Sequence, residues 1–178
     1  MTHAPDRLNN LLGALVDALS RQVELATTAV AGQGGGAPAA LVQLARHSDL
    51  TVDDLRRRLA LTHSAVVRLL DRLAERDLVA RHRSTVDARR ARLSLTPAGA
   101  ALAAAVLEAR ARVLAAAVDD LDTAESAALE ALLDRLLLAL PTSAEHSSQI
   151  CRLCHLRDCP ADRCPVEMRY QEFVSRSR

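Results

Sequence analysis

Apolar positions follow helical spacing from the start of the chain. Between residues 7 and 31 they recur every three or four residues, as Leu8, Leu11, Leu12, Leu15, Leu19 and Val23. This spacing predicts one long amphipathic helix. The glycine-rich GQGGG at residues 32–36 is expected to end it. Pro38 suits the first turn of a second helix that reaches about His47.

Two further helices are predicted on either side of a very short turn. A short helix is expected within residues 49–61, with Thr51 as its N-cap and Asp53 and Asp54 near its positive end. The turn at Leu61-Thr62 leads into a longer helix over residues 64–76. The apolar positions available for its packing are Val67, Leu69, Leu70, Leu73 and Leu78. Two helices joined in this way form a helix-turn-helix.

The spacing of apolar positions then changes to two. Residues 78–82 and 90–95 alternate apolar and polar side chains, and the polar RSTVDAR separates them. This pattern predicts a two-stranded hairpin, or wing.

Two more long helices complete the body. Thr96 and Pro97 begin one that runs to about residue 118, and Thr123 is the expected cap of another that ends at Leu140. The second carries a broad leucine stripe. Residues 141–149 are expected to be a polar linker before the cysteine segment, and a short helix with Tyr170 and Phe173 follows.

These elements predict a mainly α fold, a winged helix-turn-helix core between long N- and C-terminal helices with a small two-strand wing. We divide the chain into an N-terminal helix, a winged helix-turn-helix domain, two C-terminal helices and a cysteine-rich tail. These parts are residues 1–36, 37–96, 97–140 and 141–178.

Charge is segregated although the whole chain has a net charge of only +1. Residues 62–95 carry eight arginines and four acidic residues, whereas residues 97–140 carry three arginines and seven acidic residues. Such asymmetry suggests a local anion-binding surface beside a non-binding one. Two ordinary solvated faces would give the same counts.

The chain is expected to be cytoplasmic and not to bind a membrane. No apolar run reaches the roughly 18 residues that a membrane span needs, and the N-terminus has no apolar signal-peptide region. In a reducing compartment, four close cysteines are more often metal ligands or redox thiols than structural disulfides.

Residues 59–100, LALTHSAVVRLLDRLAERDLVARHRSTVDARRARLSLTPAGA, resemble the MarR (multiple antibiotic resistance regulator) family of bacterial transcription factors. The resemblance rests on the recognition helix VVRLLDRLAERDLVAR, the Asp87-x-Arg89 pair of the wing and the LTPAG at residues 95–99. Asp77 stands where the family usually has glycine, and aspartate tolerates the left-handed backbone that such a turn needs.

The resemblance implies binding to double-stranded DNA. The N-terminal residues of a recognition helix reach base edges in the major groove, and a wing arginine suits a narrow minor groove. The family assigns the minor groove to Arg89, with Asp87 orienting its guanidinium. The expected DNA-binding residues are Thr62, His63, Ser64, Arg68, Arg83, Asp87, Arg89 and Arg90. The alternative is that Thr62 only caps a helix and that the arginines are merely solvated.

The resemblance also implies a homodimer formed by the first helix and the last two long helices. Their leucine stripes support this, since one wing and three short helices cannot cover so much apolar surface. Two recognition helices related by a two-fold axis would read a near-palindromic operator.

The tail contains C-x2-C-x4-C-x4-C, formed by Cys151, Cys154, Cys159 and Cys164. Zinc sites usually use two separated CxxC pairs, whereas a compact loop that ends in Cys-Pro is closer to iron–sulfur ligation. We therefore expect these four thiols to hold an iron–sulfur cluster or a zinc ion. A metal-free thiol/disulfide switch and haem on a Cys-Pro pair remain alternatives, and His146 and His155 are substitute ligands.

These observations lead to three hypotheses. The first is a transcriptional repressor whose tail senses redox state, iron or metal, with Tyr170 and Phe173 docking the tail on the body. The second is a small-molecule-responsive repressor with a structural zinc tail. The third, an enzyme that uses the thiols, has little support, because no nucleophile–base pattern is present and GQGGG lacks the Lys-Ser/Thr of a phosphate loop.

Overall fold

The structure is a computed structural model that describes residues 4–47, 50–83, 91–155, 159 and 161–176. Its elements in chain order are α1 (Ala4–Ala31), α2 (Ala37–Arg46), α3 (Val52–Leu59), α4 (His63–Glu75), β1 (Val79–Arg83), β2 (Ala91–Leu95), α5 (Pro97–Ala116), α6 (Thr123–Ala139), α7 (Ala144–Ile150), the 3-10 turn η1 (Cys151–Leu153) and α8 (Pro165–Arg176). The predicted fold class, mainly α with a winged helix-turn-helix and long flanking helices, is confirmed.

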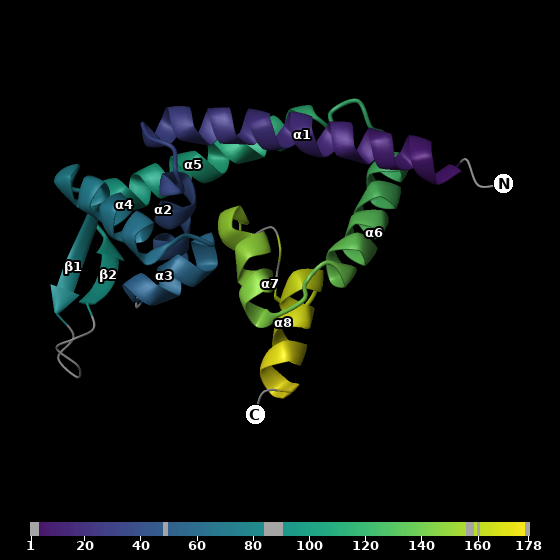
Figure 1. The fold of residues 1–178 in the computed structure, drawn as a ribbon. Coiled ribbons are helices and arrows are strands. Elements are labelled where there is room, and N and C mark those ends of the chain that lie inside the picture. Colours follow the sequence, from purple (N-terminus) through teal and green to yellow (C-terminus); the bar gives the residue numbers. More distant parts are fainter. Residues whose placement is uncertain (1–3, 48–49, 84–90, 156–158, 160, 177–178) are drawn as a thin grey trace.

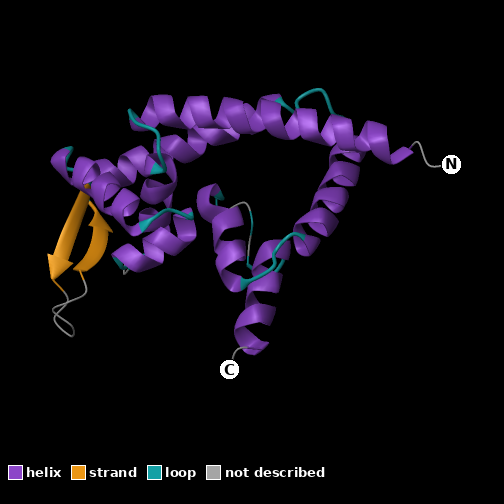
Figure 2. Ribbon diagram, viewed as in Figure 1, coloured by secondary structure: helices purple, strands orange, loops and turns teal. Residues whose placement is uncertain are grey.

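The helices form a frame with the winged helix at one end (Figure 1). The long α1 lies along α5, and α6 turns away from the far end of this pair. The chain then folds back through α7 and α8, so that α7 packs against α3. Figure 2 shows that the only strands drawn among the described residues are the two of the wing. No helix in the described ranges is long and apolar enough to cross a membrane.

One apolar core holds α2, α3, α4 and the wing together with the start of α5. Its largest fully buried apolar side chains are Leu41, Leu55, Leu69, Leu70, Leu73 and Leu93. On α4 the buried face also includes Val66, while Val67 is partly exposed. The prediction had placed Val67 in this face and omitted Val66, because a run of two valines does not show which of them points inward.

Side-chain caps define the two helices of the helix-turn-helix. Thr51 accepts a hydrogen bond from the Asp54 amide at 3.1 Å, and the Asp54 carboxylate accepts one from the Thr51 amide at 3.0 Å. This reciprocal pair is a capping box, so the predicted Thr51 cap is confirmed. Helix α3 then ends at Ala60 with a left-handed φ of 54°.

A tight turn connects α4 to the wing at the position where the family usually has glycine. Asp77 adopts φ 54°, its amide donates to Ala74 O, and the Leu78 amide donates to Leu73 O. These two bonds form a Schellman motif, which requires the left-handed residue. The predicted left-handed conformation of Asp77 is therefore confirmed.

The wing continues directly from this turn and returns into α5. Strands β1 and β2 are antiparallel, with Val79 opposite Leu95 and Arg83 opposite Ala91. Thr96 caps α5 by accepting from the Gly99 amide at 3.0 Å, and its own hydroxyl donates to Asp77 O. A Cβ on Gly99 would lie 2.0 Å from Leu78 O. In the LTPAG segment, Thr96 thus caps α5 and Gly99 allows the backbone of α5 to approach Leu78 closely.

Two local predictions are wrong. Asp122, rather than Thr123, caps α6, because its carboxylate accepts from the amides of Ala124 and Glu125. The expected polar linker at residues 141–149 contains α7. This segment is polar and too short to form a stable helix alone, but Ser143 caps it and packing against α3 holds it.

Candidate DNA interface and cysteine centre

The N-terminal turn of α4 is exposed at the surface of the winged helix. Its buried face consists of leucines and one valine, so the polar residues of the first turn point away from the core. Thr62, His63, Ser64 and Arg68, four of the predicted DNA-binding residues, are all exposed. The structure thus brings these four together on one helix and leaves them accessible.

Thr62 has a structural role as well as an exposed position. Its hydroxyl accepts from the Ala65 amide at 3.3 Å and lies 3.3 Å from the Ser64 hydroxyl. The capping role that we considered as the alternative is therefore present. It orients the Thr62 and Ser64 hydroxyls at the end of the helix that would face DNA.

The wing residues are described only in part. The backbone of Arg83 ends β1, whereas Asp87, Arg89 and Arg90 lie outside the described residues, so their predicted roles stay predictions. Sequence reasoning missed Arg81. Its guanidinium forms an ion pair with Asp71 of α4 at 2.7 Å, which ties the wing to the outer face of the recognition helix. Opposite charges ten residues apart gave no local signal of this contact.

A second arginine connects the recognition helix to α1. Arg76, at the C-terminal end of α4, donates through Nη1 to the Ala31 carbonyl at 2.7 Å. That carbonyl is at the end of α1, where helix carbonyls lack partners within the helix. A Cβ on the adjacent Gly32 would lie 3.1 Å from the same guanidinium. The Arg76 side chain therefore joins the C-terminal end of α4 to the end of α1.

The long helices expose apolar side chains that the single chain does not cover. On α1 the exposed fraction of Leu8 is 65%, and on α6 that of Leu136 is 50%. The exposed large apolar residues of these helices are Leu8, Leu11, Leu12, Leu15, Val16, Leu25, Leu132, Leu133, Leu136 and Leu138. Exposed apolar side chains in this number are typical of an interaction surface.

Comparisons with known proteins identify this architecture. A model of the MarR family matches residues 36–90. This part of the chain is therefore similar to the MarR family. The YusO protein of Bacillus subtilis is 26% identical, with a TM-score of 0.67 over 78% of this chain and 99% of its own. A MarR family transcription regulator is also 26% identical, with a TM-score of 0.65 over 76% of this chain and 91% of its own.

A third similar structure contains nucleic acid. A point mutant of MepR from Staphylococcus aureus, solved bound to an oligodeoxyribonucleotide, is 22% identical, with a TM-score of 0.58 over 75% of this chain and 98% of its own. No curated protein matches by sequence. The YusO match covers 78% of this chain. The unmatched share, about a fifth, is similar in size to the tail at residues 141–178.

The four cysteines of this tail form two pairs of free thiols. Cys151 and Cys154 hydrogen-bond each other, and so do Cys159 and Cys164. Charge interactions also couple Cys151 to Cys164 and Cys159 to Cys154. The fold therefore brings both pairs into one neighbourhood.

The pairing of the thiols shifts their pKa values in opposite directions. The hydrogen bond from Cys151 lowers the pKa of Cys154 to about 6, with help from the positive charges of Arg110 and Arg46. The same bond raises the pKa of Cys151 well above its usual range. Burial, together with the bond to Cys164, raises the pKa of Cys159 to about 12. The lowered pKa favours the thiolate form of Cys154, the form that binds metals and attacks electrophiles.

Hydrogen bonds from the winged helix hold the first cysteine turn in place. Arg46 of α2 donates to the Cys151 carbonyl at 2.7 Å, and the buried Gln43 donates to the Arg152 carbonyl at 3.0 Å. Gln149 of α7 donates to the Arg57 carbonyl of α3 at 3.0 Å. The cysteine tail is therefore attached to both helices that precede the recognition helix.

The predicted aromatic anchor is only partly present. Tyr170 lines a cavity against α2 and α3, whereas Phe173 lies against Arg169 of its own helix, with the guanidinium carbon 5.1 Å from the ring centre. The buried residues of α8 are Pro165 and Val166, which directly follow Cys164. Apolar docking of the tail thus occurs next to the last cysteine.

Four thiols are the donor set that an iron–sulfur cluster or a zinc ion would use. Arg46 and Arg110 supply positive charge that offsets thiolate charge. Within the described ranges, however, no three His, Cys, Asp or Glu side chains are already gathered closely enough to hold a metal ion. A centre that uses all four thiols requires the two pairs to move together.

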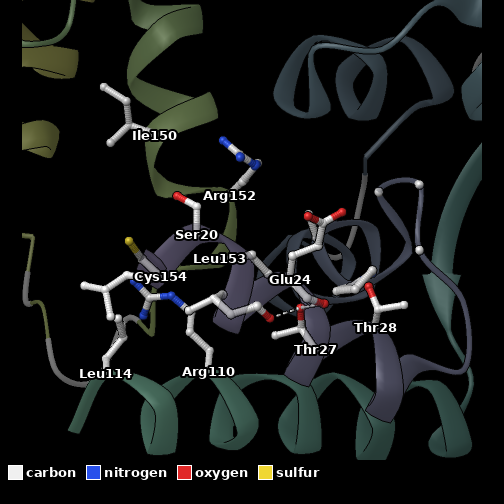
Figure 3. A pocket seen from close by; sticks show the side chains of 17 residues that line it. Ser20, Glu24, Thr27, Thr28, Arg110, Leu114, Ile150, Arg152, Leu153 and Cys154 are labelled. Carbon is white, nitrogen blue, oxygen red and sulfur yellow. Dashed lines mark hydrogen bonds between the residues drawn. The ribbon is translucent and has the colours of Figure 1, made fainter. Parts of the chain in front are cut away.

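A cavity of about 580 Å³ lies between α1, α5 and the first cysteine turn. Figure 3 shows Thr27 and Glu24 from α1, Arg110 and Leu114 from α5, and Cys154 around it. Its size is within the range of small-molecule sites. Because Cys154 and Arg152 belong to the tail, the tail forms one wall of this cavity.

Proposed function

We propose that the protein is a dimeric, sequence-specific DNA-binding repressor that acts in the cytoplasm, where operator DNA lies. The observation that carries the proposal is the exposed first turn of α4, with Arg68 one turn further along the same helix. Helix N-termini with small polar residues suit base edges and phosphates. The MepR mutant bound to an oligodeoxyribonucleotide supports this use of the fold.

The dimer would form through α1 with α5 and α6, as the family resemblance implies. The exposed leucines of α1 and α6 support it, since burial of apolar surface is the main driving force for association. Two α4 helices would then reach successive major grooves, and the operator would be nearly palindromic. We propose no catalytic activity.

Selection of bound fragments from a genomic DNA library tests this proposal. Arg68→Ala should weaken binding of the selected operator about tenfold and reduce its salt dependence, because a phosphate or guanine contact is lost. Arg112→Ala is the matched control, since Arg112 is an exposed arginine of α5 that pairs with Glu108 of its own helix. Equal effects of both variants, or no sequence preference among the fragments, would contradict the proposal.

We further propose that the tail senses redox state, iron or metal through Cys151, Cys154, Cys159 and Cys164. When bound, an iron–sulfur cluster would supply a redox-active centre, and zinc a redox-inert one. The chain's own contribution is to hold the thiols beside two arginines and to connect them to α2 through Arg46. A signal alters DNA affinity only if it favours one arrangement of these helices over another.

Anaerobic purification, followed by iron, sulfide and zinc analysis per chain and an absorption spectrum, tests the sensor. Iron and sulfide with a brown chromophore support a cluster, and the spectrum also reveals haem. Operator binding should then differ between oxidised and reduced protein. If changing all four cysteines to serine leaves operator binding and its redox response unaltered, the tail is not a sensor.

The cavity of about 580 Å³ favours a second candidate, a small-molecule-responsive repressor with a structural zinc tail. Stoichiometric zinc, no colour and no redox response would favour it. A screen of small anions and aromatic compounds for release of operator DNA would then identify the effector class.

A further inference from the structure

A second, smaller cavity lies at the contact between the winged helix and the tail. Its volume is about 140 Å³, and it is enclosed by α2 and α3 on one side and by α7 and α8 on the other. Its lining residues include Arg46, His47, Arg58, Ser148, Glu167 and Tyr170. Three of these side chains are basic, and basic side chains are rarely buried without a partner.

Two buried nitrogen atoms of these basic residues have no hydrogen-bond partner. Arg46 donates through Nη1 to the Cys151 carbonyl, but its Nε is buried without an acceptor. Nε2 of His47 is likewise buried without a partner. Buried donors normally find an acceptor, because an unmet donor loses its bonds to water. The cavity therefore lacks acceptor groups at the end of α2.

The cavity also has surplus positive charge. In the part of the chain that the structure describes, neither Arg46 nor Arg58 forms an ion pair, and Glu167 is the one acidic side chain in the lining. Arg58 donates only to the neutral amide oxygen of Gln43, at 3.2 Å. Burial and the charges of Arg58 and Arg46 lower the pKa of His47, while Glu167 raises it.

We propose that this cavity binds a small tetrahedral oxyanion, phosphate or sulfate, between the winged helix and the tail. Such an anion accepts several hydrogen bonds, including one from His47, and carries the charge that Arg46 and Arg58 leave uncompensated. The size of the cavity excludes a nucleotide. The same chemistry would accept the phosphate group of a small phosphomonoester only if the rest of that molecule could extend outside.

The bound oxyanion would fasten the tail to the helix-turn-helix. It would contact Arg46, whose guanidinium donates to the Cys151 carbonyl. It would also contact Arg58, which donates to the side chain of Gln43, and Gln43 in turn donates to the Arg152 carbonyl. Oxyanion and cysteine centre would then stabilise the same docked arrangement of the tail. The inference does not depend on the proposed DNA function, because binding is measurable without DNA.

Thermal unfolding and titration calorimetry of the full-length protein test the site, with inorganic phosphate, sulfate, glycerol phosphate and chloride at constant ionic strength. Phosphate or sulfate at about 100 times its Kd should raise the Tm by about 5 to 10 °C, at one anion per chain. Chloride should have no such effect. A response to glycerol phosphate alone would show that the natural ligand is a phosphomonoester.

Three variants locate the site. Arg58→Gln should weaken phosphate binding at least tenfold. Arg56→Gln, with the same charge change on the same helix but outside the cavity, should not. Arg68→Ala should also retain the response, which excludes binding at the DNA face.

Several outcomes would overturn the inference. One is a rise in Tm with phosphate that is no larger than the rise with chloride. The other is an equal loss of phosphate affinity in Arg56→Gln and Arg58→Gln. If Arg58→Gln does not fold, His47→Gln replaces it, and an unchanged Kd in that variant would be equally decisive.

Discussion

The winged helix and the cysteine tail are held in different ways. The winged helix encloses fully buried leucines such as Leu41, Leu69 and Leu70. In the tail, Cys164, Val166 and Ser147 are among the few buried side chains of its described residues. Its docking combines limited apolar packing, such as that of Leu153 against the core, with single hydrogen bonds to backbone carbonyls. The winged helix has a core of its own, whereas the described part of the tail buries few side chains.

The largest expected effect is in the winged helix. Gly99→Ala should destabilise the protein by about 3 kcal/mol or prevent folding, because overpacking against rigid backbone cannot be relieved by side-chain movement. Gly13→Ala is the matched control, since an added Cβ there meets nothing within 4 Å. It should stabilise α1 by about 0.5 to 1 kcal/mol. Denaturant unfolding measures the change in the free energy of unfolding for both variants. If both changes had the same sign, the close contact between residue 99 and Leu78 O would be contradicted.

Truncation of one apolar residue in each region tests whether they unfold separately. Leu70→Ala should lower the free energy of global unfolding by about 2 to 5 kcal/mol. Val166→Ala should mainly increase proteolysis and hydrogen exchange within α7 and α8 and leave exchange in α4 unchanged. If Val166→Ala accelerated exchange in both regions equally, the tail would be part of the main cooperative unit.

Removal of one docking hydrogen bond should release the tail without damage to the core. Arg46→Met keeps the length of the side chain but removes its donors, and should cost about 1 to 3 kcal/mol of docking free energy. Faster hydrogen exchange at residues 150–154, with an unchanged rate in α4, is the expected result. Arg112→Met is the control, because Arg112 is exposed and pairs within its own helix. Similar exchange profiles for both variants would show that the Arg46 contact does not hold the tail.

The smallest effect concerns the turn before the wing. Asp77→Gly should stabilise the protein by up to about 1 kcal/mol, because glycine adopts φ 54° without the steric cost that aspartate has there. The higher entropy of glycine in the unfolded chain reduces this gain. Chemical denaturation measures it. A loss of stability would indicate that the Asp77 side chain makes a contribution in the native state.

The sequence by itself determined the elements whose causes are local. Apolar spacing located the helices of the winged helix, the period of two located its strands, and the side chains of Thr51 and Thr96 act within three residues. The left-handed Asp77 was predictable because few residues tolerate that backbone. Thr62, His63, Ser64 and Arg68 were expected from the family resemblance, and the structure leaves all four exposed.

Only the tertiary structure decided how the tail meets the body. The polar residues 141–149 contain a helix because it packs against α3, and the bond from Arg46 to Cys151 joins residues 105 positions apart. The cavity with Arg46, His47 and Arg58 also exists only when α7 and α8 fold back on α2 and α3. Local sequence patterns carry no information about such contacts. The surfaces of α2 and α3 and of α7 and α8 each look like ordinary polar surface until they pack against each other.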